Sequence, residues 1–78
     1  MFFVYVLESL DGFHWYVGIT DDVQRRLAEH NEGRSMYTKK HKPWKVKSYT
    51  AFLERARAEA FERYLKTHSG RAFTKKHF

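Results

Sequence analysis

The chain has 78 residues, no Cys and a formal net charge of +6. So short a chain excludes a second domain with its own core, and the absence of Cys excludes disulfides and thiolate metal ligands. We therefore expect one domain over residues 1–78, with a largely aromatic core made of Phe2, Phe3, Trp15, Trp44, Phe52 and Phe61. The first apolar run ends at Glu8, too early for a membrane span or a signal peptide, so we expect a cytoplasmic protein without membrane contact.

The basic residues are concentrated in two stretches of the chain. No Asp or Glu lies between Glu32 and Glu54, and none follows Glu62. These stretches hold Arg34, Lys39, Lys40, Lys42, Lys45, Lys47, Arg63, Lys66, Arg71, Lys75 and Lys76. Such segregation is typical of proteins that bind a phosphate backbone. Aromatic and His residues lie among the charges and favour nucleic acid over a merely solvated surface or an anionic membrane contact.

The chain opens with a pattern that predicts a β-hairpin. Residues 2–7 form an apolar, β-branched run, and residues 14–19 form a second one. Asp11-Gly12 between them is typical of a two-residue hairpin turn. With an even number of loop residues, cross-strand partners have an odd index sum, which places Tyr5 and Tyr16 on one face.

A helix is predicted after the hairpin. Residues 20–22 supply N-cap candidates and first-turn acids, and the helix should extend to about Asn31. Val23 and Leu27 lie one turn apart and would form its buried stripe. Gly33 is the expected end of the helix.

The second half of the chain predicts a loop, a strand and two helices. Residues 34–42 have no apolar periodicity and should form a basic loop, whereas residues 44–52 alternate as a third strand. A helix over residues 54–68 would face inward through Ala58, Phe61 and Leu65. Ser69-Gly70 should break it, and residues 71–78 would form a short last helix that is anchored by Phe73. The order β-β-α-β-α-α predicts an α+β fold, with a small three-stranded antiparallel sheet flanked by helices.

Five side chains are candidates for chemistry: Tyr5, Tyr16, Arg26, His30 and Glu62. Arg26 and His30 are four residues apart on one helix, so they project together beside the apolar stripe. Spacing alone leaves other interpretations open: two sheet aromatics, two surface polar residues, and an ion pair between Glu62 and Lys66. It does not by itself indicate an enzyme.

Several short motifs in order resemble the GIY-YIG nuclease family. They are Phe3-Val4-Tyr5, Tyr16-Val17-Gly18, residues 26–31, residues 38–44, an aromatic strand that ends near Phe52, residues 60–66, and the Ser-Gly-Arg sequence of residues 69–71. The resemblance covers essentially the whole chain and is greatest to small stand-alone bacterial members. These are related to the nuclease domain of the UvrC repair protein and to the Slx-type structure-specific nucleases.

The resemblance implies a role for each candidate residue. Tyr5 and Tyr16 match the motif tyrosines, which position and deprotonate the attacking water, and either could be the base. Arg26 matches the Arg that holds the scissile phosphate, and His30 matches a position that is often His and supports the water or a tyrosine. Glu62 matches the lone metal-binding carboxylate, which implies Mg²⁺ or Mn²⁺ as the cofactor. A free Tyr has a pKa near 10, so a tyrosine base at neutral pH needs a neighbour that lowers it.

The implied activity is that of a divalent-metal-dependent endonuclease that hydrolyses phosphodiester bonds, in DNA more than in RNA, and serves repair or recombination. We expect the nucleic acid to contact Lys39, Lys40, Lys42, Lys66, Arg71, Lys75 and Lys76. We expect no separate DNA-recognition domain, so selectivity should come from the shape of a branched, flapped or single-stranded substrate, or from a protein partner. The oligomeric state is left open.

The sequence departs from the family pattern in two places. Phe3 occupies the position of the first motif's Gly, and a late Asn that some members carry has no counterpart. Two alternatives therefore stand beside the nuclease: a catalytically silent nucleic-acid-binding module on the same scaffold, and a small basic structural protein such as a ribosome-associated one.

Overall fold

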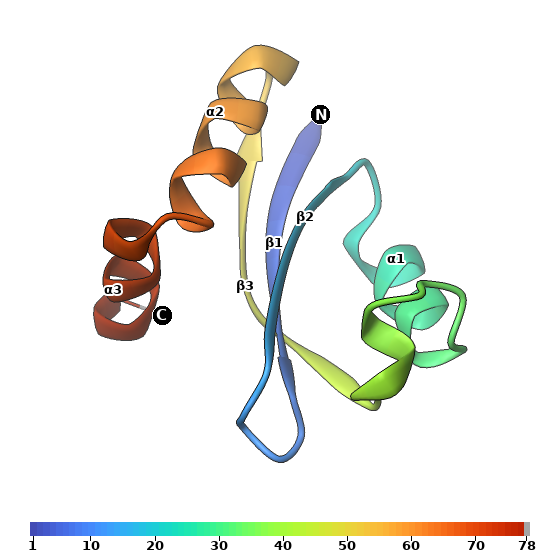
Figure 1. The fold of residues 1–78 in the computed structure, drawn as a ribbon. Coiled ribbons are helices and arrows are strands. Elements are labelled where there is room, and N and C mark those ends of the chain that lie inside the picture. Colours follow the sequence, from blue (N-terminus) through green and yellow to red (C-terminus); the bar gives the residue numbers. More distant parts are fainter. Residues whose placement is uncertain (78) are drawn as a thin grey trace.

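The computed structural model describes residues 1–77 and has the predicted order of elements (Figure 1). They are β1 (Phe2–Ser9), β2 (Trp15–Thr20), α1 (Val23–Asn31), the 3₁₀ helix η1 (Thr38–Lys40), β3 (Trp44–Phe52), α2 (Arg55–Leu65) and α3 (His68–His77). The predicted α+β fold and order are confirmed, and the third strand has the predicted bounds. The expected basic loop contains one short 3₁₀ turn. Phe78, the last residue of the predicted final helix, lies outside the described residues.

The three strands form an antiparallel sheet in the order β2-β1-β3, with β1 at the centre. Tyr5 pairs with Gly18 and Leu7 pairs with Tyr16, so Tyr5 and Tyr16 are diagonal neighbours on one face, as predicted. The prediction of a two-residue turn is wrong, because Ser9 and His14 are still paired and the loop between them has four residues. The even loop length preserved the parity of the pairing. Gly12 lies in this loop with a φ of 81°, a value that favours glycine.

Helices cover both faces of the sheet (Figure 1). On the α2 side, Val4 and Val6 of β1 pack against Ala58 and Leu65. On the α1 side, the buried cluster consists of Tyr5, Leu7 and Trp44, with Val23 and Leu27 of α1 packed against it. The prediction of a largely aromatic core is wrong: of the six aromatics expected, only Trp44 is fully buried. The centre of the fold is the aliphatic run of β1, because the middle strand of a three-stranded sheet is covered on both faces.

Helix α1 ends at Asn31 as predicted and begins directly after the predicted N-cap candidates, but the predicted first-turn acids are wrong, because the helix starts at Val23 and its first turn holds no acidic residue. The Asp22 side chain accepts a hydrogen bond from the backbone N–H of Arg25 and caps the first turn. At the other end, Gly33 N–H donates to His30 O and Arg34 N–H donates to Glu29 O, the pattern of a Schellman motif. Gly33 has the positive φ of 83° that this motif requires.

The boundary between the last two helices differs from the prediction. Helix α2 ends at Leu65 and α3 begins at His68, so Ser69 and Gly70 lie inside a helix and do not break one. The Thr67 hydroxyl caps α3 by accepting from Gly70 N–H at 3.0 Å. A Cβ on Gly70 would lie 1.8 Å from the backbone oxygen of Tyr64. The glycine therefore serves the close approach of α3 to the end of α2.

In residues 1–77, no helix is both long and apolar enough to span a lipid bilayer.

Candidate active site

Four of the five candidate side chains meet on the α1 side of the sheet. Tyr5 comes from β1, Tyr16 from β2, and Arg26 and His30 from α1. The ring centroids of Tyr5 and Tyr16 are 6.2 Å apart, and those of Tyr16 and His30 are 4.9 Å apart. The Arg26 guanidinium approaches the Tyr5 hydroxyl closely enough to act on its pKa. Two phenols, an imidazole and a guanidinium thus share one place in the fold.

A buried hydrogen-bond chain fixes Tyr5. Its Oη lies 2.9 Å from His30 Nε2, and His30 Nδ1 lies 2.6 Å from Thr38 Oγ1. All three residues are at most 1% exposed. In a neutral imidazole one ring nitrogen donates and the other accepts, so His30 joins the Tyr5 and Thr38 hydroxyls, one through each nitrogen. The chain therefore runs from Arg26 through Tyr5 and His30 to Thr38.

Thr38 is not among the site residues that the sequence predicts. Its only signal was its place in the 38–44 stretch of the family resemblance. Trp44 Nε1 donates to the Thr38 carbonyl at 2.8 Å, and Asn31 holds the Trp44 backbone through bonds to its N–H and C=O. The end of α1, η1 and the start of β3 are thereby joined directly behind His30.

The environment keeps both buried partners neutral. Burial raises the pKa of Tyr5 to about 12, although the hydrogen bond and charge of Arg26 oppose the shift. Burial also lowers the pKa of His30, and the Arg26 charge adds to that effect. A buried phenol with a raised pKa keeps its proton at neutral pH. The structure therefore does not give Tyr5 the lowered pKa that a tyrosine base would need.

Arg26 is held by an acidic neighbour on its own helix. Its Nη1 lies 2.8 Å from Glu29 Oε1, and the two side chains are 32% and 27% exposed. The hydrogen bond that Arg26 donates to Glu29 raises the pKa of Arg26, which stays charged. Glu29 is another residue that the sequence did not single out. It orients the guanidinium while leaving part of it accessible to an incoming anion.

Glu62 lies on α2, the helix that covers the other face of the sheet (Figure 1). Its side chain is 23% exposed, and its Oε2 lies 3.2 Å from Lys66 Nζ, the ion pair that the sequence offered as an alternative. Its charge raises the pKa of Tyr5, as the weakest of several causes. Within residues 1–77, no hydrogen bond joins Glu62 to the tyrosines or to Arg26, so its side-chain contact is with Lys66 and not with the other four candidates.

Glu62 is the candidate metal ligand that the family resemblance assigns, and it would hold the ion with a single carboxylate. Residues 1–77 contain no group of three or more His, Asp or Glu side chains suited to hold a metal ion. This donor set does not suit a structural zinc ion, which needs four protein ligands. It fits Mg²⁺, which usually binds one or two carboxylates and completes its octahedron with waters and phosphate oxygens.

Gly18 makes room for the Tyr5 ring. A Cβ at this position would lie 2.6 Å from Tyr5 Oη and 2.8 Å from Tyr5 Cζ. The two residues are direct cross-strand partners, so the ring of one lies over the backbone of the other. The glycine of the Tyr-Val-Gly motif thus has a packing reason that the sequence alone did not give.

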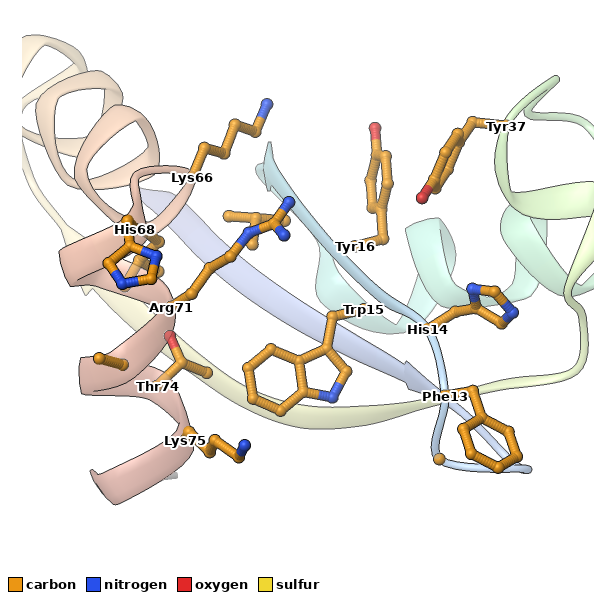
Figure 2. Close-up of a pocket in the computed structure, with 14 residues that line it drawn as sticks. Phe13, His14, Trp15, Tyr16, Tyr37, Lys66, His68, Arg71, Thr74 and Lys75 are labelled. Carbon is orange, nitrogen blue, oxygen red and sulfur yellow. The ribbon is translucent and has the colours of Figure 1, made fainter.

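An open groove of about 940 Å³ lies between β2 and α3 and reaches Tyr16 (Figure 2). We call it the β2–α3 groove, and its main side chains are Trp15, Tyr16, Tyr37, Lys66, Arg71 and Lys75. It includes neither Tyr5, Arg26 nor His30. Three of the predicted nucleic-acid contacts line it, whereas the others are exposed outside it: Lys39, Lys40, Lys42 and Lys76.

Comparison with known proteins identifies the family of this chain. Residues 1–76 match the family model of the GIY-YIG catalytic domain. The chain therefore belongs to the GIY-YIG family, whose catalytic domain is a nuclease domain.

The relatives found are UPF0213 proteins. The chain is 46% identical over 61 residues to one from Listeria innocua and 40% identical over 65 residues to one from Streptococcus pneumoniae, matches that cover 77% and 82% of this chain. They span 67% and 65% of the relatives' lengths, so the chain matches about two thirds of each. The solution NMR structure of the UPF0213 protein BH0048 from Bacillus halodurans is 31% identical, with a TM-score of 0.58, over 97% of this chain and 84% of that one.

Proposed function

We propose that this protein is a divalent-metal-dependent endonuclease that hydrolyses phosphodiester bonds in DNA. The observation that carries the proposal is the meeting of Tyr5, Tyr16, Arg26 and His30 at one point of the sheet, with the Glu62 charge felt there. Phosphodiester hydrolysis needs a cation for the phosphate, a group that orients water, and help for the leaving oxygen. The cluster offers side chains of each kind.

Arg26 is the proposed phosphate ligand. Its charge is permanent, and Glu29 fixes its orientation while about a third of the side chain stays exposed. A preorganised guanidinium donates to phosphate oxygens and offsets the charge that develops in the transition state.

We assign contact with the attacking water to Tyr16 and a positioning role to Tyr5. Tyr16 is half-buried and lines the groove, whereas Tyr5 is 1% exposed and its hydroxyl is hydrogen-bonded to His30. The Tyr5–His30–Thr38 chain holds the imidazole ring 4.9 Å from the Tyr16 ring and thereby restricts the phenol's orientation. Orientation of this kind lowers the entropy that the reaction must lose.

Glu62 would hold Mg²⁺ or Mn²⁺ with one carboxylate. When bound, the ion neutralises phosphate charge and stabilises the leaving oxygen. Lys66 now pairs with that carboxylate at 3.2 Å, so it is the residue that must give way to the ion. Its ammonium then becomes free to contact the nucleic acid backbone.

The proposal is tested by cleavage of branched, flapped, single-stranded and duplex DNA and RNA with Mg²⁺, Mn²⁺ or EDTA. Glu62→Gln keeps the shape of the side chain but removes its charge, and we expect it to lower the cleavage rate by about 100-fold or more, as removal of a catalytic group does. Glu59→Gln is the matched control, since Glu59 lies one turn earlier on α2 and pairs with Arg55. It should cut at the wild-type rate.

Binding without any metal-dependent product would support the silent module, and neither binding nor cleavage would support a structural protein. Equal cleavage rates of the Glu62→Gln and Glu59→Gln variants would contradict the assignment of Glu62 as the metal-binding carboxylate. We propose a preference for branched, flapped or single-stranded DNA, which fits service in repair or recombination.

A further inference from the structure

The β2–α3 groove combines aromatic rings with positive charge. Trp15, Tyr16 and Tyr37 supply the rings, and Lys66 and Arg71 are among the cations. Within the described residues, no Asp or Glu lines it. Its volume of about 940 Å³ lies at the upper end of the range for small-molecule sites, roughly 300–1,000 Å³. The groove is thus large and open, and its side chains suit an anionic ligand that contains aromatic rings.

We propose that the β2–α3 groove binds an unpaired segment of a polynucleotide, with a base stacked on Trp15 and phosphates on the cations of α3. The inference rests on the proposed nuclease function and names the subsite that holds its substrate. Base stacking on aromatic side chains next to a cationic track is how proteins hold single strands without reading sequence.

Trp15 is prepared for stacking by its neighbours. Its Nε1 donates to Glu8 Oε2 at 2.9 Å, which fixes the plane of the ring, and Lys47 Nζ lies 5.3 Å from its centroid. The side chain extends from β2 toward α3, and Trp15 and Lys75 both line the groove (Figure 2). A paired base has both faces covered by its neighbours in the duplex, so only an unpaired base can use this ring.

The cations of α3 face the same space. Arg71 and Lys75 are four residues apart, so they lie one turn apart on one side of the helix. Both are exposed, and Arg71 extends toward β2 (Figure 2). Their spacing along the helix lets them contact different phosphates of one strand.

The groove is continuous with the candidate active site through two residues. Tyr16 lines the groove and is also packed against His30. Lys66 lines it and also pairs with Glu62. A strand that lies in the groove therefore passes the proposed water-binding phenol and the proposed metal ligand, which places one of its phosphodiesters at the reacting centre.

The first test measures the anisotropy of a labelled oligothymidylate in EDTA, where binding is separate from cleavage. We expect Arg71→Gln/Lys75→Gln to weaken binding by about tenfold or more, since each phosphate contact contributes to affinity. Arg57→Gln/Arg63→Gln removes the same charge from α2, outside the groove, and should weaken binding by only about twofold. Equal weakening in the two variants would overturn the proposal.

The second test isolates stacking. Trp15→Leu should bind oligothymidylate about fivefold or more weakly, and an oligomer of abasic sites should bind wild type and Trp15→Leu alike. In wild type, oligothymidylate should also quench the fluorescence of Trp15. In Trp15→Phe only the buried Trp44 remains, and oligothymidylate should leave its fluorescence unchanged. Quenching that persists in Trp15→Phe overturns the stacking, even if Trp15→Leu folds poorly. The proposed stacking would also be contradicted if duplex DNA were bound as tightly as the single strand.

These measurements separate the groove from the nuclease. Oligothymidylate and oligouridylate arms decide between DNA and RNA as the source of the strand. Glu62→Gln should bind at least as tightly as wild type in EDTA, because binding there needs no metal and the substitution frees Lys66 from its ion pair. If binding depends on the groove but no cleavage occurs under any condition, the proposed groove is supported and the proposed nuclease function is contradicted. If cleavage is unaffected by substitution of Trp15 and Arg71, the proposed nuclease function is supported and the proposed role of the groove is contradicted.

Discussion

At the scale of single residues, the candidate site depends on one buried phenol. Tyr5 is enclosed by His30, Arg26 and the backbone of Gly18, and each neighbour limits where its hydroxyl can point. A polar group buried in this way must keep its hydrogen-bond partner, because removing that partner costs about 1–3 kcal/mol. The cluster is therefore rigid on its inner side, whereas Tyr16 on its outer side faces the groove.

The raised pKa of Tyr5 predicts a decrease in stability at high pH. The folded-state pKa is about 12, against an ordinary value of 10.0. The native state therefore holds its proton more tightly than the unfolded chain, and the resulting stability, about 3 kcal/mol, is present below pH 10 and disappears as pH rises toward 12. Urea unfolding of wild type and Tyr5→Phe at pH 9 to 12 measures this.

The difference in unfolding free energy between the two proteins should shrink by that amount across the range, since other titrating groups are common to both. A constant difference would mean that Tyr5 titrates alike in both states.

At the scale of elements, close backbone approaches set the positions of the strands and helices. Gly18 lets β2 pass beneath Tyr5, and Gly70 lets α3 meet the last turn of α2. The two approaches differ in kind, because the first neighbour is a side chain and the second is backbone. They predict different consequences for the same substitution.

Gly18→Ala should impair the site more than the fold. The new Cβ would lie 2.6 Å from Tyr5 Oη, so the ring must move away from His30. Overpacking of this kind costs about 1–3 kcal/mol. We expect cleavage to fall by about tenfold or more, because a displacement near 1 Å can cost about 100-fold.

Kinetics and thermal unfolding measure both effects, with Gly18→Ala/Tyr5→Phe as the comparison. Removing the hydroxyl should restore part of the stability without restoring activity. Full activity in Gly18→Ala would show that the position of Tyr5 is unimportant.

Gly70→Ala should destabilise the fold at least as strongly as Gly18→Ala. Its Cβ would lie 1.8 Å from Tyr64 O and 2.6 Å from Leu65 Cα, and backbone cannot rotate away. We expect a destabilisation of about 3 kcal/mol or more, at the upper end for overpacking, by chemical denaturation. Ser69→Ala on the adjacent exposed position is the control and should change stability by less than about 0.5 kcal/mol. A neutral Gly70→Ala would contradict the close approach.

At the scale of the whole molecule, positive charge lies on both sides of the β2 edge. The segment that contains η1 and helix α3 lie on opposite faces of the sheet (Figure 1). Tyr16 connects the two regions, since its ring lies 6.0 Å from that of Tyr37 and it also lines the β2–α3 groove. A bound strand that reaches both regions must cross the edge of the sheet at the candidate site.

Charge removal from the basic loop tests this arrangement. Lys39→Gln/Lys40→Gln/Lys42→Gln should weaken DNA binding and lower the slope of log K against log salt by about 0.7–0.9 for each phosphate that the variant no longer neutralises. Titrations in EDTA from low to high salt give the slope. The weakening should be similar for every DNA sequence, because bonds to phosphates carry no sequence information.

The control is Arg55→Gln/Arg57→Gln/Arg63→Gln, which lowers the net charge equally on the outer part of α2. It should leave the slope nearly unchanged. Identical slopes in the two triple variants would show that only net charge matters, and that the loop does not touch the nucleic acid.

The sequence by itself determined the features that depend on neighbouring residues. Alternation gave the bounds of β3, the Asp22 cap and Gly33 gave those of α1, and an even loop length put Tyr5 and Tyr16 on one face. The ordered motifs identified the family, because each is a short local pattern. Such features survive errors of detail, as the wrong turn length shows.

Only the tertiary structure decided what depends on distant parts of the chain. Thr38 contacts His30 because the segment after α1 folds back on that helix. A glycine is needed at position 70 inside α3 because the backbone oxygen of Tyr64 leaves no room for a Cβ. The groove exists because α3 turns toward β2, and the raised pKa of Tyr5 follows from burial under α1. Packing and desolvation arise between elements, and periodicity along the chain does not encode them.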